Sequence, residues 1–197
     1  MSSRRRGSAP GADVGIGRHV ALLRGVNVGR AKRVAMAELR ALVEDLGYGD
    51  VRTLLNSGNV VFTAPGVHPR VAAARIEEGL VTRLGVTARV MALSAAELHA
   101  VVTGNPLATV VDDPARLLVA VLGDPADAAR LAPLARQDWG TETLAIGGRV
   151  AYLWCPDGML AGRLAEAVGR VLGDAVTTRN WATMTKLHAL AVGARAT

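Results

Sequence analysis

Apolar and polar residues follow two different periods in the first half of the chain, and each change of period marks a new element. Residues 18–25, RHVALLRG, are rich in β-formers and end at a glycine, which predicts a strand. A helical period follows over residues 35–47, with Gly47 as its stop. The expected inward face of this helix comprises Met36, Leu39, Leu42, Val43 and Leu46.

The next three elements are predicted in the same way. VRTLL and NVVFT are strands joined by the short hairpin loop NSG. Residues 67–84 form a second helix, and VTARVMAL forms a fourth strand. We expect the inward side chains of the second helix to be Val71, Ala74, Ile76, Leu80 and Leu84. The order is strand, helix, strand, strand, helix, strand.

The second half of the chain repeats this order. It begins with a helix at SAAELHAVVTG, where Ser94 is the N-cap and Glu97 completes a capping box. RLLVAVLG is then a strand, PADAARLAPLA a helix, TETLAI and RVAYLWC two strands, and GMLAGRLAEAVGRVLG a helix. A short strand near residues 175–177 and a last helix over 179–192 close the chain.

Two successive βαββαβ units predict an α+β protein with two ferredoxin-like halves, each an antiparallel sheet with helices on one face. The expected organisation is a disordered basic arm over residues 1–17, a first half over 18–93, a linking helix and loop over 94–113, and a second half with the C-terminal helix over 114–197.

Composition narrows the class of protein. No apolar run approaches the ~20 residues of a membrane span. The chain has 197 residues and 1 cysteine, so a disulfide framework is excluded, and a reducing cytoplasm is the expected location. The N-terminal residues lack the apolar core of a secretory signal.

A net charge of +6 and a pI of about 10.6 favour anionic partners. Part of the excess lies in the arm, where Arg4, Arg5 and Arg6 either contact nucleic acid or form a solvated tail. Nearly all cations are arginines, and the only lysines are Lys32 and Lys186. Both lysines lie in the segments that carry the candidate site.

The segments ALLRGVNVGR, MAELRALVEDLGYGDVRTLLNSGNVVF and VTTRNWATMTKL together resemble the bacterial family called domain of unknown function 1697. The resemblance covers residues 18–190. Two positions depart from the family pattern, namely Arg30, where the family has a second glycine, and Asn56, where it has glutamine. The resemblance implies a duplicated ferredoxin-like fold and a bacterial cytoplasmic protein, and it implies no activity.

The segment LLRGVNVGR reads as either an anion seat or a simple turn. Gly25 and Gly29 can leave the backbone open to a close approach, and Arg24, Asn27 and Lys32 surround them with hydrogen-bond donors. The spacing is neither a Walker loop nor a dinucleotide fingerprint.

The other two segments carry similar chemistry. In NSGNVVF, Asn56 and Asn59 are candidate hydrogen-bonding groups, although the segment also suits a tight hairpin. In TTRNWATMTKL, Thr177 or Thr178 is the expected helix cap, so that Arg179, Thr183 and Lys186 would share one stripe. Asn180 would point with the apolar side chains of that helix.

The sequence does not support a metal site, an acid–base pair, a reactive thiol or base stacking. The four histidines do not pair at metal-ligand spacing, and no metal or cofactor is expected. Adjacent acids read as solvated surface, and Cys155 reads as a small apolar strand residue. Few aromatic residues are available for stacking on RNA bases, so nucleic acid would be held through backbone charge.

We therefore expect a binding protein for a small anionic or phosphorylated ligand, held by Arg24, Asn27, Lys32, Asn56, Asn59, Arg179, Asn180, Thr183 and Lys186. The alternatives are a nucleic-acid backbone binder and a protein–protein or oligomerisation module. Catalysis and oligomeric state stay open, and no nucleophile or base can be named.

Overall fold

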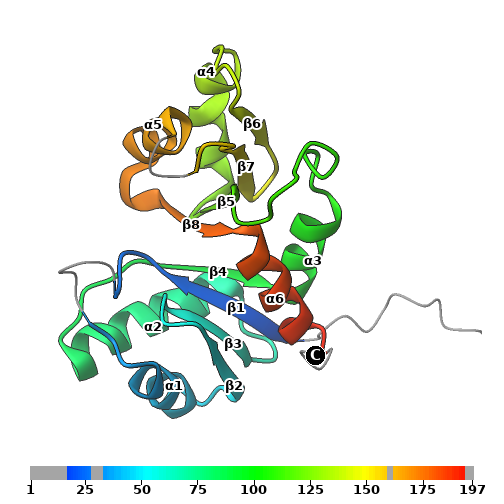
Figure 1. The fold of residues 1–197 in the computed structure, drawn as a ribbon. Coiled ribbons are helices and arrows are strands. Elements are labelled where there is room, and N and C mark those ends of the chain that lie inside the picture. Colours follow the sequence, from blue (N-terminus) through cyan, green and yellow to red (C-terminus); the bar gives the residue numbers. More distant parts are fainter. Residues whose placement is uncertain (1–16, 28–32, 159–161, 194–197) are drawn as a thin grey trace, which may run out of the picture.

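The computed structural model describes residues 17–27, 33–158 and 162–193 (Figure 1). Residues 1–16 of the predicted basic arm and Lys32 lie outside the described residues. The first half of the fold consists of β1 (Arg18–Leu23), α1 (Met36–Asp45), β2 (Gly49–Leu54), β3 (Asn59–Thr63), α2 (Pro69–Leu84) and β4 (Val90–Ser94).

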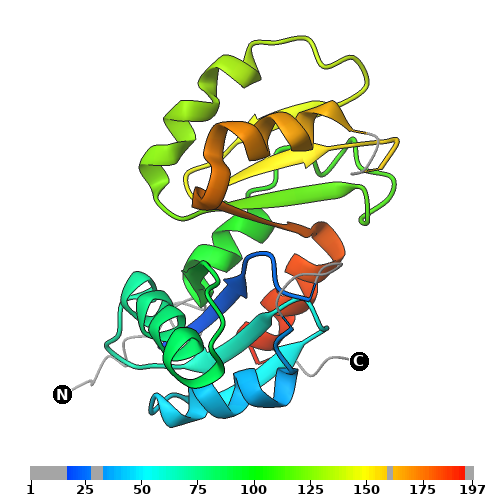
Figure 2. The ribbon, with the colours of Figure 1, turned by 90° about the vertical axis from the view of Figure 1, so that its left-hand side faces the viewer.

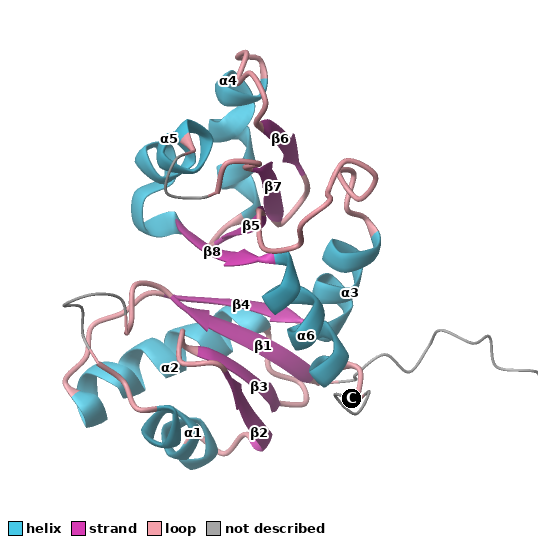
Figure 3. Ribbon diagram, viewed as in Figure 1, coloured by secondary structure: helices cyan, strands magenta, loops and turns pink. Residues whose placement is uncertain are grey.

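Helix α3 (Ala95–Thr103) leads to the second half, in which Figure 3 distinguishes helices and strands by colour. The elements that follow α3 are β5 (Leu117–Leu122), the 3-10 helix η1 (Pro125–Leu131), α4 (Ala132–Ala135), β6 (Thr143–Ile146), β7 (Val150–Trp154), α5 (Arg163–Leu172), the 3-10 turn η2 (Gly173–Ala175), β8 (Val176–Asn180) and α6 (Trp181–Ala191).

Both sheets are antiparallel and have the same topology. The strand orders are β2-β3-β1-β4 and β6-β7-β5-β8, so each position in the first sheet has its counterpart in the second. The two ferredoxin-like halves predicted from the strand and helix order are confirmed.

The central strands are buried on both faces, which explains their nearly continuous apolar sequences. In β1, Ala21 and Leu23 pack toward α1 and α2, whereas Val20 and Leu22 face the other half. Side chains from β5, α3 and α6 join that second group, so the two halves share this cluster. Because this cluster contains side chains of both halves, it packs the two halves against each other. Figure 2 shows the second half above the first.

Local sequence chemistry sets several helix ends as expected. Ser94 accepts a hydrogen bond from the backbone N–H of Glu97, and the Glu97 carboxylate accepts one from the backbone N–H of Ser94, which completes the capping box of α3. Helix α1 buries the predicted face, with Leu39, Leu42 and Val43 innermost.

Other predicted details were wrong. Val71 and Ala74 are exposed, because α2 starts at Pro69 and buries the face that contains Ala72, Ala73 and Ile76. The segment from Pro125 to Ala135 is a 3-10 helix followed by a single α-turn, since Pro133 lacks the N–H that a continuous helix needs.

Two elements also start at residues that differ from the prediction. Strand β4 starts at Val90 because its partner β1 ends at Leu23. The last helix starts at Trp181, because residues 176–180 pair with β5 and Asn180 caps the helix.

Candidate functional site

Three segments that are distant in sequence meet at Arg179, which lies in β8 opposite Val119. Its guanidinium uses every one of its N–H groups, and all the acceptors are neutral oxygens. Nε donates to Oδ1 of Asn59 at 2.5 Å. Nη2 donates to the carbonyl oxygens of Leu23 at 2.7 Å and Ser57 at 2.9 Å. Nη1 donates to Oγ1 of Thr177 at 3.1 Å and to the carbonyl oxygen of Thr178 at 2.9 Å.

The charge of Arg179 has no compensating acid. Among the described residues, no carboxylate lies within ion-pair distance of its guanidinium. Burial lowers the pKa of Arg179 to about 10, which leaves the side chain charged at neutral pH. A desolvated cation of this kind makes the local electrostatic potential more positive, and this potential attracts an anion that approaches.

The hairpin between β2 and β3 supplies the acceptors on one side of Arg179. Asn59 is fully buried, and its Nδ2 donates to the carbonyl oxygen of Leu54 at 2.8 Å and to Oγ of Ser57 at 2.9 Å. A Cβ at Gly58 would lie 2.7 Å from Cβ of Leu23, so only glycine lets the hairpin approach β1 this closely. Asn59 is therefore a positioning residue with no amide group free for a ligand.

Asn27 also serves the protein itself. Its Oδ1 accepts from the backbone N–H of Val34 at 2.9 Å, and its Nδ2 donates to the carbonyl oxygens of Val34 at 2.8 Å and Asn56 at 2.7 Å. The side chain thus joins Val34 and the hairpin to the segment that follows β1. Asn56 takes part through its backbone, and the residue itself is exposed.

Arg24 joins the two halves. Its Nε lies 3.2 Å from Oδ1 of Asp174, and its Nη1 donates to the carbonyl oxygen of Val176 at 2.6 Å. Arg24 is predicted to offer its charge to a ligand, but that charge is already paired with Asp174.

The C-terminal motif is arranged differently from the helical stripe predicted for it. Arg179 lies in a strand, and Asn180 caps α6 by accepting a hydrogen bond from the backbone N–H of Thr183 at 2.9 Å. Neither Thr177 nor Thr178 is the cap. Thr183 is 7% exposed, whereas Lys186 lies on the solvent-facing side of the helix. Arg179, Thr183 and Lys186 therefore do not form one stripe, because the chain changes from strand to helix between them.

A cavity of about 400 Å³ opens beside Arg179. Its described polar lining consists of Ser57, Thr178, Arg179, Asn180 and Thr183, and its apolar lining of Leu23, Val26, Leu55, Ala115 and Leu118. No acidic residue is among the described residues that line it. Because Oγ of Ser57 accepts from Asn59, its hydroxyl proton is free to be donated into the cavity.

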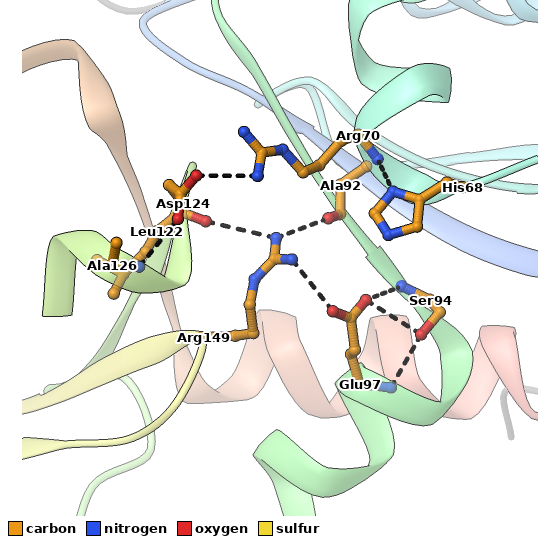
Figure 4. A network of polar contacts seen from close by, with 9 residues as sticks. All are labelled: His68, Arg70, Ala92, Ser94, Glu97, Leu122, Asp124, Ala126 and Arg149. Atoms are coloured by element: carbon orange, nitrogen blue, oxygen red, sulfur yellow. Dashed lines mark hydrogen bonds and ion pairs between the residues drawn. The ribbon is translucent and has the colours of Figure 1, made fainter.

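A second polar cluster, which the sequence does not predict, centres on Arg149 between the halves (Figure 4). Nη1 of Arg149 lies 3.1 Å from Oε1 of Glu97, and Nη2 donates to the carbonyl oxygen of Ala92 at 3.1 Å. Nearby, Arg70 and Asp124 form an ion pair at 2.9 Å. Arg149 follows a Gly-Gly turn, and nothing in that local pattern reveals a partner in the other half.

The remaining candidate groups carry little chemistry. Cys155 is buried, and desolvation together with Glu142 raises its pKa to about 12, so the thiol is not a nucleophile at neutral pH. Within the described part of the chain, no group of three or more His, Cys, Asp or Glu side chains is arranged to hold a metal ion. His99 and His188 do meet, with Nδ1 and Nε2 3.0 Å apart.

None of the helices in the described ranges is both long and apolar enough to cross a membrane.

Comparison with known proteins supports the fold and the family. The conserved bacterial protein SP0830 from Streptococcus pneumoniae has a similar structure, with a TM-score of 0.72 and 24% sequence identity over 88% of this chain and 98% of that protein. No curated protein matches the chain. The family model described as "Protein of unknown function (DUF1697)" matches residues 16–152. The chain therefore belongs to the DUF1697 family.

Proposed function

We propose that this protein binds a small anionic ligand in the cavity beside Arg179. The observation that carries the proposal is the guanidinium of Arg179, which is desolvated, bonded only to neutral oxygens and adjacent to a cavity whose described lining holds no acid. Partly burying an unpaired charge is unfavourable, and an anion in the cavity would offset that penalty.

Arg179 would act mainly through its charge. Its five N–H groups already have acceptors, so it attracts the anion through space without forming a new fork of hydrogen bonds. Direct hydrogen bonds to the anion would come from the hydroxyls of Ser57, Thr178 and Thr183 and from Nδ2 of Asn180. The first turn of α6 lies at the same place and adds its partial positive charge.

The decisive experiment changes the charge of the cavity and leaves the backbone caps intact. Asn180→Asp keeps an N-cap acceptor of similar strength, but it places a carboxylate beside Arg179. Asn105→Asp is the matched control, because Oδ1 of Asn105 also accepts a backbone N–H, that of Leu107, at 2.9 Å and the residue does not line the cavity.

Thermal shift with inorganic phosphate, pyrophosphate, citrate and nucleotides measures binding to the native state. We expect one class of small anion to raise the melting temperature of the wild type and of Asn105→Asp, with the shift lost in Asn180→Asp. Equal shifts in all three proteins, or no shift with any anion, would remove the proposal. Short oligonucleotides at two salt concentrations belong in the same panel, because a strongly salt-dependent shift would favour nucleic-acid backbone binding.

A further inference from the structure

We infer that the ligand of the Arg179 cavity is an amphipathic anion, and that Leu55 is the residue that selects its apolar part. This inference rests on the proposed function and names the class of ligand. The cavity lining divides evenly between aliphatic and polar side chains, with Leu55 at the tip of the β2–β3 hairpin. An inorganic anion would use only the polar part of that lining.

Leu55 is unusual in its backbone conformation. Its φ is 57°, in the left-handed region where a side chain with Cβ is strained. Glycine or asparagine would adopt this angle at the start of a hairpin loop with less strain. The hairpin therefore explains the angle and leaves the choice of leucine unexplained.

Packing does not explain the leucine either. Its side chain is 54% exposed, and it belongs to none of the three hydrophobic clusters of the protein. The neighbouring Leu54 does pack against the central core. A strained, exposed leucine that lines a cavity is accounted for if its aliphatic side chain contacts a ligand, because strain of this kind gathers at functional sites.

The other aliphatic residues extend the same surface. Leu23 and Val26 come from the end of β1 and the loop that follows it, and Leu118 comes from β5. An anionic head near Arg179 would leave a short apolar tail against these side chains. Burial of that tail would then add affinity in proportion to the apolar area removed from water.

The test is a series of n-alkanoates from acetate to octanoate, with the matching alkyl phosphates as a second arm and inorganic phosphate as the reference. Affinity is measured by calorimetry on the full chain. We expect about a fourfold gain in affinity per methylene until the cavity is filled. The arm with the tighter binding identifies the anionic head as carboxylate or phosphate.

Two variants separate the role of Leu55 from a general effect on the fold. Leu55→Asn should raise the melting temperature by about 2 °C, because it relieves the strain at this position, and should weaken binding of hexanoate about tenfold. It should leave the affinity for the short anions unchanged. The control Val110→Asn makes the same kind of change at an equally exposed residue, 54% exposed, outside the cavity and should leave every affinity unchanged.

The outcomes distinguish the inference from the proposal beneath it. If short anions bind and Asn180→Asp abolishes their binding, but chain length and Leu55→Asn have no effect, the amphipathic inference is wrong and the anion site stands. If no anion of either arm binds the wild type, both are wrong.

Discussion

Arg179 and Arg149 both lie at the junction between the two halves, but their charges are compensated differently. Nη1 of Arg149 faces the carboxylate of Glu97 at 3.1 Å, with the two side chains 14% and 32% exposed. Arg179 meets only carbonyl, amide and hydroxyl oxygens. A compensated cation makes a complete contact within the protein, whereas an uncompensated one leaves a positive potential that a ligand can use.

The two arginines also differ in what they connect. Arg179 binds backbone carbonyls of both the β1 end and the hairpin, so it fixes the relative position of three segments. Arg149 reaches the carboxylate of Glu97 in α3 and the carbonyl oxygens of Ala92 in the edge strand β4 and Leu122 in β5, which is fewer hydrogen bonds than Arg179 makes. We therefore expect removal of Arg179 to be the more damaging change, even though it breaks no ion pair within the described structure.

The largest expected effect is that of Arg179→Met. The change leaves the acceptors of Leu23, Ser57 and Asn59 without a donor, and we expect the free energy of unfolding to fall by about 4 kcal/mol. Urea denaturation followed by circular dichroism measures it. A loss under about 1 kcal/mol would show that these hydrogen bonds are replaceable by water.

The next largest effect is that of Arg149→Met, which removes one partner of the Glu97 ion pair. We expect a loss of about 2 kcal/mol in the free energy of unfolding. A double-mutant cycle with Glu97→Gln, which retains an acceptor for the capping box, should give a coupling of about 1 kcal/mol. A coupling near zero would mean that Glu97 does not compensate Arg149, and the contrast with Arg179 would disappear.

A smaller effect is the pH dependence of the free energy of unfolding. It should come from histidines and not from Arg179, whose acceptors do not titrate. Burial, with a smaller contribution from His99, lowers the pKa of His188, and burial also lowers the pKa of His19. Both groups bind protons more weakly in the folded state than in the unfolded state. Their contribution to the free energy of unfolding is therefore complete above about pH 6.5, and it is lost as pH falls through their folded pKa values.

We therefore expect the free energy of unfolding to fall by about 1 kcal/mol in total between pH 7 and pH 5. His188→Gln should remove part of that slope. The loss caused by Arg179→Met should be the same at both pH values. A loss that depends on pH would reveal a titrating partner of Arg179.

The smallest expected effect is that of salt. Between 0.05 and 1 M NaCl, the loss in free energy of unfolding caused by Arg149→Met should become smaller by about 0.5 kcal/mol, because salt screens a partly exposed ion pair. The loss caused by Arg179→Met should stay constant, since neutral acceptors are screened little. Equal salt dependence of the two variants would argue that both arginines have the same electrostatic role.

The predicted details that failed have a common origin. Thr177, Thr178 and Asn180 are all reasonable helix caps, and only the pairing of residues 176–180 with β5 decides that Asn180 is the one. Val71 is a reasonable inward residue, and only the contact of α2 with β4 and α1 turns it outward. In each case several local choices are close in energy, and a distant strand or helix decides between them.

The sequence by itself determined the order of strands and helices, the two ferredoxin-like halves and the capping box at Ser94, because periodicity and caps act between residues a few positions apart. It also placed Arg179, Asn59 and Asn180 among the candidate residues. Only the tertiary structure decided that Arg179 reaches Asn59, Ser57 and Leu23, which are 120, 122 and 156 residues away. Contacts over such separations depend on how two complete sheets pack around a shared core, and no local pattern encodes that packing.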